Sequence, residues 1–196
     1  GCMSKLSGIR VVDLSLFLPG PMMTSMLADH GAEIIKIEPP GGDPARQMEP
    51  FEEGQSVWFR NINRGKQSVV LDLKQKDNLQ KLYGLVEESD IFVEAFRPGV
   101  ANRLEIDYAT LSAIKPRIIY CSISAFGQDG PLAHHPAHDL AVEAFAGFMS
   151  VNDKGDGEPV VPAFPAADAS ASLVALSGIL MALIGRERTG IGDYLD

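Results

Sequence analysis

Ile9-Arg-Val-Val-Asp-Leu14 and Ala32-Glu-Ile-Ile-Lys-Ile37 are two short apolar runs that are predicted to be buried strands. Between them, Pro19-Gly-Pro21 breaks the chain, and residues 22–30 have the pattern of a short helix that ends at Gly31. A strand, a turn, a helix and a second strand within about 30 residues form a βαβ unit. Such a unit implies a parallel pair of strands joined by a right-handed crossover.

Strands and helices continue to alternate as far as residue 124. An amphipathic helix is predicted at residues 77–88 and a short helix at residues 108–114. A long polar segment, residues 41–67, is expected to be held in place around Trp58. This alternation predicts an α/β fold, with a doubly wound, mostly parallel, Rossmann-like sheet and flanking helices. The further strands are predicted at Ser68-Val-Val-Leu-Asp-Leu73, Ile91-Phe-Val-Glu94 and Arg117-Ile-Ile-Tyr-Cys-Ser-Ile-Ser124.

The loops after three predicted strands are expected to form a ligand crevice, because parallel strands bring their carboxyl ends to one edge of the sheet. None of these loops has the G-x-G-x-x-G pattern, which disfavours an ordinary dinucleotide fold. Backbone N–H groups of the glycine-rich third loop are suited to hold an oxyanion or a thioester carbonyl. Three ordinary turns are an equal alternative. The loops are Leu18-Pro-Gly-Pro21, Ala95-Phe-Arg-Pro-Gly99 and Ser124-Ala-Phe-Gly-Gln-Asp-Gly-Pro131.

Length and charge restrict the class of protein. The 196 residues suit one α/β domain, or one domain with an extension. A formal net charge of −9 argues against a nucleic-acid surface, which needs clustered Lys and Arg. Two local groups of basic residues still allow a small anionic ligand. They are Arg60, Arg64, Lys66 and Lys74, and then Arg97 and Arg103.

The two cysteines, Cys2 and Cys121, have no metal-ligand spacing, so no metal site is predicted. Cys121 lies in an apolar run and is expected to be a buried, inert thiol. The longest apolar run, residues 173–184, is judged too short to span a bilayer, and no signal-peptide pattern is found. These features predict a cytoplasmic protein without a membrane partner.

Asp168 stands where a proline-paced segment ends and a long apolar run begins, so it is predicted to be the N-cap of a helix. Arg186 and Arg188 fall in the expected last turn, and Gly190 is the expected stop. A plain structural cap is one interpretation. The other is catalytic, because unpaired N–H groups and the helix dipole keep a carboxylate ionised there, and an ionised carboxylate is a usable nucleophile.

His138 follows the glycine-rich loop, at the start of a helix predicted over residues 136–150. A lone histidine in this position is typically a capping or packing residue. If it faces Asp168 across the crevice, the two side chains form a pair that can exchange acid and base roles at a substrate carbon. His134 and His135 are interpreted as solvated residues of a polar turn.

A series of motifs extends along nearly the whole chain: Leu6-Ser-Gly-Ile-Arg-Val-Val-Asp-Leu14, Gly31-Ala-Glu-Ile-Ile-Lys-Ile-Glu38, Asn63-Arg-Gly-Lys-Gln-Ser-Val-Val-Leu-Asp-Leu73, Val93-Glu-Ala-Phe-Arg-Pro-Gly99, Pro116-Arg-Ile-Ile-Tyr120, Phe126-Gly-Gln-Asp-Gly-Pro131 and Arg188-Thr-Gly-Ile-Gly-Asp-Tyr-Leu-Asp196. Together and in this order they resemble the class III coenzyme A-transferase family. That family includes formyl-CoA transferase, carnitine CoA-transferase and α-methylacyl-CoA racemase. Any one of the motifs alone would be a weak signal.

The resemblance implies a CoA-binding fold, acyl-CoA and a carboxylic acid as substrates, no tightly bound cofactor, and a homodimer. It also implies that Asp168 is the catalytic carboxylate, which attacks the acyl-CoA thioester and passes through a mixed anhydride and an aspartyl-CoA thioester. The resemblance places Leu71, Phe96 and Arg103 at the CoA site, and Leu18, Arg97 and Gly127, from the three loops, are predicted to join them.

Several positions depart from transferases of the formyl-CoA type. Leu18 stands where they carry Gln, Ala95 where they carry Asn, and Pro39 where they carry Arg. His138 matches the racemases, whereas Ala169-Ser-Ala-Ser172 lacks the glycine-rich run that racemases place after the Asp. A CoA-transferase is the first hypothesis, and an α-methylacyl-CoA racemase that uses His138 and Asp168 as an acid–base pair is the alternative.

The family's members are much longer than this chain. Residues 5–196 are therefore interpreted as the N-terminal CoA-binding α/β domain, with the second domain absent. Residues 1–4 are expected to lie outside this domain, as non-native or disordered residues. A truncated, non-catalytic CoA-binding domain is thus a further alternative.

Overall fold

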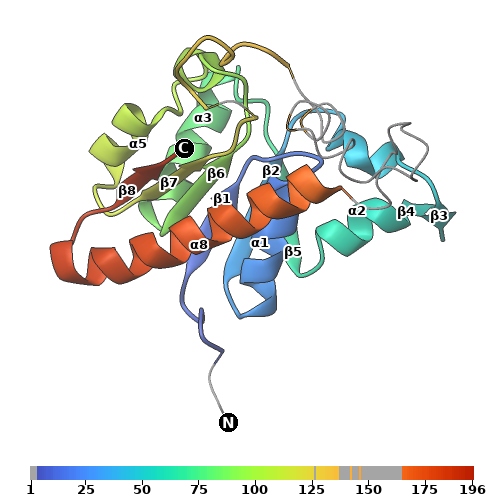
Figure 1. Ribbon diagram of the computed structural model, residues 1–196, viewed down its shortest axis with the longest axis horizontal. Helices are drawn as coiled ribbons and strands as arrows, with labels where there is room; N and C mark the ends of the chain where they lie inside the picture. The colour runs from blue at the N-terminus through green and yellow to red at the C-terminus, as the bar shows by residue number, and fades with distance from the viewer. Residues whose placement is uncertain (1–3, 126, 137–141, 143–145, 147–164) are drawn as a thin grey trace.

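The structure is a computed structural model of the chain that describes residues 4–125, 127–136, 142, 146 and 165–196. Its centre is a parallel sheet with the strand order β5-β2-β1-β6-β7-β8, which confirms the predicted α/β fold (Figure 1). The order reverses between β1 and β6, so the loops after these two strands diverge and leave room for a ligand. The strands are β1 (Arg10–Asp13), β2 (Glu33–Glu38), β5 (Lys66–Val70), β6 (Ile91–Glu94), β7 (Ile119–Ser122) and β8 (Asp193–Leu195).

Helices cover both faces of the sheet, and each face has its own apolar core. Alternation along β1 divides its side chains, so that Val11 packs under α1 (Gly20–Asp29) and α8 (Ala166–Thr189), while Val12 packs on the opposite face. That opposite face is covered by α3 (Lys76–Glu87) and α5 (Tyr108–Ile114). The four inner strands, β2, β1, β6 and β7, are almost fully buried, which is why their sequences are rich in apolar residues, whereas the edge strands β5 and β8 are mostly exposed.

The polar segment between β2 and β5 has secondary structure of its own. It contains the 3-10 helix η1 (Pro44–Gln47), a short hairpin of β3 (Phe51–Glu52) and β4 (Gln55–Ser56), and α2 (Val57–Ile62). Arg46 holds this segment to the sheet, because its guanidinium makes two bonds of 2.7 Å to Glu38 and stacks over Phe59. The expectation that the segment is held in place is therefore confirmed.

Helix α8 ends as predicted but begins earlier than predicted. Gly190 follows it with a φ of 74°, a conformation that glycine adopts readily. The prediction that Asp168 is the N-cap residue is wrong, because Pro165 occupies the cap position and Asp168 lies within the first turn. Proline lacks an N–H and has a nearly helical φ, so the helix can begin directly after it. The dipole argument for an ionised carboxylate still applies to a first-turn position.

By length and composition, α8 is the one helix of the described chain that could cross a membrane, since an 18-residue window of it has a mean hydropathy of 1.8. The apolar run of residues 173–184, which was expected to be too short for a bilayer, is only part of this longer helix. A core helix of a soluble protein passes the same test. One face of α8 packs on α1, β7 and β8, and its buried Arg186 pairs with Asp90 at 2.9 Å.

Besides the elements between β2 and β5, two further described elements were absent from the sequence prediction. They are α4 (Val100–Arg103), which lies between β6 and α5, and β8 at the edge of the sheet. Cys121 is buried in β7, as predicted, and burial raises the pKa of its thiol to about 12. Most of the helix predicted over residues 136–150 lies outside the described residues.

Candidate functional site

A cavity of about 660 Å³ lies at the carboxyl edge of the sheet, beside the point where the strand order reverses. Its wall includes residues from each of the three loops that were predicted to converge, among them Leu18, Arg97 and Ser124. Asp168 reaches the same cavity from the first turn of α8. The predicted convergence of the three loops is therefore confirmed, and it brings a first-turn carboxylate into a mostly apolar surrounding.

The loop after β1, residues 14–19 and called here the β1 loop, lies against the beginning of α8. The Ser172 hydroxyl is 2.8 Å from the Pro19 carbonyl oxygen and 2.8 Å from the Asp168 carbonyl oxygen. Ser172 is fully buried, so these two carbonyls are its partners in the folded chain. One side chain thus joins the β1 loop to the turn that carries Asp168.

Two buried charged side chains, Lys36 and Asp43, hold the backbone of the β1 loop in place. Lys36 and Asp43 form an ion pair of 2.9 Å in which both side chains are almost fully buried. The Lys36 ammonium also donates to the Ser15 carbonyl at 2.9 Å, and the Asp43 carboxylate accepts from the Phe17 N–H at 3.3 Å. Both ends of the pair therefore hold backbone atoms of the loop.

A second buried pair lies next to the first. Lys66 is 3.4 Å from Asp13, and it donates to the Pro21 carbonyl and to Asn63, each at 2.9 Å. Burial lowers the pKa of Lys66 to about 8, although Asp13 opposes this shift. Burial alone would raise the pKa of Asp13, but Lys66 and Lys36 bring it below its ordinary value. Asp13 is therefore ionised in the fold.

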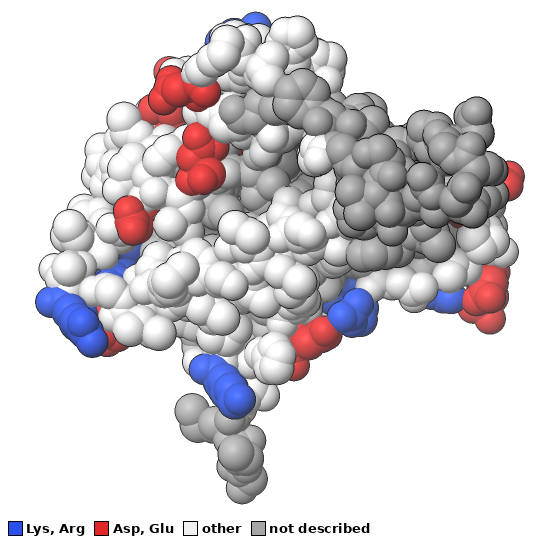
Figure 2. All heavy atoms as spheres, in the orientation of Figure 1, with Lys and Arg blue, Asp and Glu red and all other residues white. Residues whose placement is uncertain are grey.

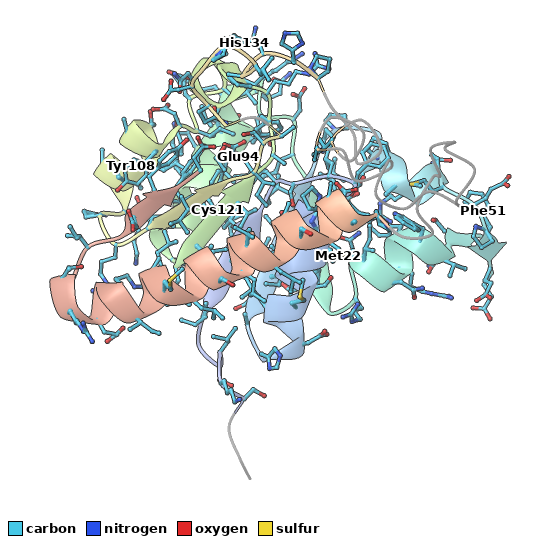
Figure 3. All side chains as sticks on the ribbon, in the orientation of Figure 1. Met22, Phe51, Glu94, Tyr108, Cys121 and His134 are labelled. Carbon is cyan, nitrogen blue, oxygen red and sulfur yellow. The ribbon has the colours of Figure 1, made fainter. Side chains whose placement is uncertain are left out.

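The loop after β6 is fixed by another buried carboxylate, that of Glu94. Glu94 is the last residue of β6 (Figure 3). Its carboxylate accepts from the Phe96 N–H at 2.7 Å and from the Tyr120 hydroxyl at 3.3 Å. Burial raises the pKa of Glu94, and burial together with the Glu94 charge raises the pKa of Tyr120. The Phe96 backbone therefore has a fixed position at the cavity wall.

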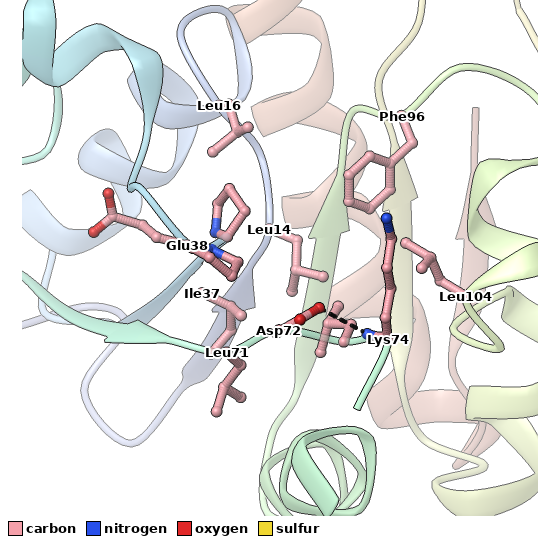
Figure 4. A pocket seen from close by; sticks show the side chains of 12 residues that line it. Leu14, Leu16, Ile37, Glu38, Leu71, Asp72, Lys74, Phe96 and Leu104 are labelled. Atoms are coloured by element: carbon pink, nitrogen blue, oxygen red, sulfur yellow. Dashed lines mark hydrogen bonds between the residues drawn. The ribbon is translucent and has the colours of Figure 1, made fainter. Parts of the chain in front are cut away.

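A smaller cavity of about 310 Å³ lies beside the larger one and shares Leu14, Leu16 and Phe96 with it (Figure 4). Leu71 lines it from the segment after β5, and Lys74 extends along its wall toward Phe96 (Figure 4). Most of the lining of the smaller cavity is apolar, and its charged residues are Lys74 and the two carboxylates Glu38 and Asp72.

The structure brings most of the predicted site residues together. Asp168, Leu18, Phe96 and Arg97 line the larger cavity, and Leu71 with Phe96 lines the smaller one. Arg103 lines neither cavity, whereas its neighbour Leu104 lines the smaller one.

Two further residues were predicted for the site, namely Gly127 of the glycine-rich loop and His138. Gly127 lies outside both cavity walls, and its φ of 76° turns the loop toward Asp196, whose side chain accepts from the Gln128 N–H at 2.9 Å. His138 lies outside the described residues. His135, which was interpreted as solvated, is exposed and also lines the larger cavity.

Several lining residues were not predicted as site residues, among them Met48 and Trp58, and Lys74 was named only within a group of basic residues that allow a small anionic ligand. Met48 and Trp58 reach the larger cavity from the segment between β2 and β5, and Lys74 reaches the smaller one. The group of four basic residues predicted near Lys74 is dispersed, because Arg60 pairs with Glu52, Arg64 pairs with Asp29 and Lys66 is buried.

Metal ligation receives no support from the described residues, among which no group of three or more His, Cys, Asp or Glu could hold an ion.

Comparison with known proteins agrees with this geometry. Residues 6–196 match the model of CoA-transferase family III. The acetyl-CoA:oxalate CoA-transferase of Acetobacter aceti is 44% identical over 191 residues, covering 96% of this chain and 49% of the relative. The succinyl-CoA:glutarate CoA-transferase of Mus musculus is 37% identical over 196 residues, covering 99% of this chain and 45% of the relative.

Solved structures show the same fold at similar identity. A CAIB/BAIF family protein from Brucella suis superposes with a TM-score of 0.95 and 36% identity, covering 100% of this chain and 53% of the other. Rv3272 from Mycobacterium tuberculosis gives a TM-score of 0.92 and 35% identity, covering 100% and 55%. The chain spans about half the length of the curated relatives that it matches. By sequence and by fold, the chain belongs to the CoA-transferase family III.

Proposed function

We propose that this chain carries the nucleophile of an enzyme that transfers CoA from an acyl-CoA to a carboxylic acid, and that the nucleophile is Asp168. The observation that carries the proposal is the position of Asp168, in the first turn of a long helix and in the wall of the larger cavity. The N-terminal dipole of a helix favours the ionised carboxylate, and an ionised carboxylate attacks a thioester.

In the proposed reaction, a carboxylate oxygen of Asp168 attacks the thioester carbonyl carbon of the acyl-CoA. The C–S bond breaks, and CoA leaves as a thiolate from a mixed anhydride. The thiolate then attacks the Asp168 carbonyl carbon, which releases the first acid as its carboxylate and leaves an aspartyl-CoA thioester. The acceptor carboxylate repeats the two steps in reverse order, which forms the new acyl-CoA and regenerates Asp168. Each step exchanges bonds of similar energy, so no single step carries the whole barrier.

The smaller cavity is proposed to hold the adenine end of CoA. Leu71 and Phe96 supply apolar surface for a flat ring, and Lys74 supplies a cation for a neighbouring phosphate (Figure 4). Leu14, Leu16 and Phe96 belong to both cavities, so a molecule that extends from one to the other would bring its far end to Asp168. Leu18 and Arg97 are proposed to contact that far end.

Other features of the proposed enzyme extend beyond the described residues. We propose a homodimer in the cytoplasm, in which residues 5–196 are the CoA-binding domain. Arg103 and Gly127 remain predicted CoA contacts, and neither receives support from the two cavities.

Covalent trapping tests the nucleophile. The 196-residue chain, and any longer natural protein that contains it, is incubated with acetyl-CoA or succinyl-CoA and quenched with hydroxylamine. Peptide mass spectrometry is expected to find a hydroxamate on Asp168, and none at this position in Asp168→Asn. The matched control is Asp77→Asn, because Asp77 also lies in the first turn of a helix, α3, but lines neither cavity.

Binding is measured in the same samples. Trp58 is the single tryptophan and lines the larger cavity, so its fluorescence should change when CoA binds. CoA binding without an adduct in either form of the protein contradicts the proposal and favours a non-catalytic CoA-binding domain. Solvent deuterium at the α-carbon of a 2-methylacyl-CoA, without an adduct and lost in His138→Ala, contradicts it in favour of the racemase.

A further inference from the structure

Among the described serines of α8, Ser172 alone forms a hydrogen bond to another part of the chain. Ser177, one and a half turns further along, donates to the Leu173 carbonyl of its own helix at 2.9 Å and is exposed. Ser172 has the equivalent bond to the Asp168 carbonyl and, in addition, lies 2.8 Å from the Pro19 carbonyl. Its single hydrogen is therefore shared between the helix and the β1 loop.

The β1 loop is in turn held at three backbone positions. Lys36 binds the Ser15 carbonyl, Asp43 accepts from the Phe17 N–H, and Ser172 binds the Pro19 carbonyl. Phe17 has a φ of 56°, a conformation that costs a bulky residue free energy and persists where its surroundings impose it. Asp43 is itself fixed, since its N–H donates to Glu38 at 2.7 Å and its carboxylate accepts from the Ala45 N–H at 2.9 Å.

We propose that Ser172 and the buried Lys36–Asp43 pair are positioning residues for Asp168, because they fix the β1 loop against the first turn of α8. This proposal rests on the proposed function, in which the Asp168 carboxylate is the attacking group. The side chains of Leu18 and Asp168 line the same cavity, from the loop and from the helix. A substrate that is held by the loop therefore meets the carboxylate at a distance set by the Ser172 bridge.

A nucleophile reacts efficiently only from a near-attack geometry, with reacting atoms about 3–3.5 Å apart, and a displacement of about 1 Å can slow a reaction about a hundredfold. Loosening one hydrogen bond between loop and helix should have a smaller effect than that. The rate of adduct formation at saturating acyl-CoA should fall, while the affinity for CoA, which depends on the smaller cavity, should remain.

The first experiment compares Ser172→Ala with Ser177→Ala in the forms of the protein used for trapping. Both variants lose a bond to the carbonyl four residues earlier, and only Ser172→Ala loses the bridge to Pro19. Ser172→Ala is expected to lower the rate of adduct formation about tenfold, with the Kd for CoA changed less than twofold. Ser177→Ala should match the wild type. Equal rates in the two variants, or a parallel weakening of CoA binding in Ser172→Ala, would overturn the proposal.

The second experiment tests whether the buried pair and Ser172 act on the same loop. Asp43→Asn removes the charge that attracts Lys36 but keeps an oxygen for the Phe17 N–H. Asp43→Asn is expected to slow adduct formation about tenfold relative to the wild type. The double variant Asp43→Asn/Ser172→Ala should be slowed by clearly less than about a hundredfold, because the effects of residues that share one structural role do not add. If the rate effects of the two single variants multiply in the double variant, the proposal that Ser172 and the buried pair act on the same loop is overturned. If Asp43→Asn does not fold, the comparison of Ser172→Ala with Ser177→Ala alone tests the proposal.

Failure of the proposed function is recognised separately, because the wild type then gives no adduct. In that case, the effect of Ser172 on the β1 loop is measured by hydrogen exchange at the Phe17 amide. Its exchange should be about tenfold faster in Ser172→Ala and unchanged in Ser177→Ala. Unchanged exchange in both variants would show that Ser172 does not hold the loop.

Discussion

At the scale of single residues, Glu38 shows how a buried carboxylate is stabilised by several partners. It ends β2 and accepts from the Arg46 guanidinium, from the Ser68 hydroxyl and from the Asp43 N–H. Burial alone would raise the pKa of Glu38, but the hydrogen bonds from Arg46 and Ser68 and from the Asp43 backbone lower it to about 2. The charged form therefore contributes to stability.

We predict that Glu38→Gln lowers the free energy of unfolding at pH 7 by roughly 2–3 kcal/mol, since a buried charged partner is lost. The pKa of Glu38 is depressed from an ordinary 4.5 to about 2. Its contribution is therefore present above pH 4.5 and is lost as the pH falls toward 2. The difference between wild type and variant should shrink over this range in urea titrations.

Glu52→Gln is the control for this prediction. Glu52 also pairs with an arginine, Arg60 at 2.8 Å, but its side chain is 65% exposed. Exposed pairs contribute about 0.2–1 kcal/mol at most, so this variant should be nearly as stable as the wild type at every pH. Similar losses in both variants would contradict the role given to the buried bonds of Glu38.

Cys121 is predicted to be unreactive in the folded protein. Burial raises the pKa of its thiol to about 12, and the thiolate is the reactive form. In a Cys2→Ser variant, a disulfide reagent at pH 8 should label less than about a tenth of the thiol in an hour, and all of it in denaturant. Rapid labelling without denaturant would show that β7 opens or is less buried than the structure indicates.

At the scale of elements, the turn between β1 and α1 depends on a close approach at Gly20. A Cβ on Gly20 would lie 2.3 Å from the Cβ and Oγ atoms of Ser15. Ser15 cannot move aside easily, because its N–H and hydroxyl both bind the buried Asp13 carboxylate. A glycine is therefore needed at position 20 because of this close packing.

Gly20→Ala is predicted to destabilise the protein by about 2–3 kcal/mol, because overpacking displaces a fixed side chain. It should also weaken the binding signal of Trp58, since the β1 loop lines the same cavity. Gly84→Ala is the control, because Gly84 lies in α3 with no atom within 4 Å of an added Cβ. Its expected effect is a gain of about 0.5–1 kcal/mol from helix propensity. Urea denaturation measures both, and equal effects would contradict the close approach.

At the scale of the whole molecule, α8 presents an apolar outer face. Figure 2 shows few charged side chains along the middle of this helix, and Val174 and Met181 there are 72% and 67% exposed. Contiguous apolar surface of this kind drives association in water.

The 196-residue chain is therefore predicted to self-associate at micromolar concentration. Replacing both exposed residues, as Val174→Gln with Met181→Gln, should shift sedimentation toward the monomer and leave the circular dichroism unchanged. Ile179→Gln provides the contrast, because Ile179 is fully buried on the inner face of the same helix and the change should destabilise the fold by at least about 2 kcal/mol. A wild-type chain that sediments as a monomer would contradict this prediction.

Local patterns in the sequence were sufficient for the order of most strands and helices. Buried parallel strands are rich in apolar residues, as β1 and β2 are, and Gly190 has the backbone conformation needed to end a helix. Asp168 also stood out from its neighbours alone, since a carboxylate at the start of an apolar helix is a local feature. The family followed from motifs along the chain.

Contacts between distant segments could be assigned only in the folded chain. Lys36 and Asp43 appear in sequence as two ordinary charged residues, yet both are buried, because the fold places backbone atoms of the β1 loop around them. Ser172 reads as one small residue among several, and its bridge to Pro19 joins positions 153 residues apart. Sequence patterns report what a residue does to its own element, whereas burial and charge pairing depend on which elements pack together.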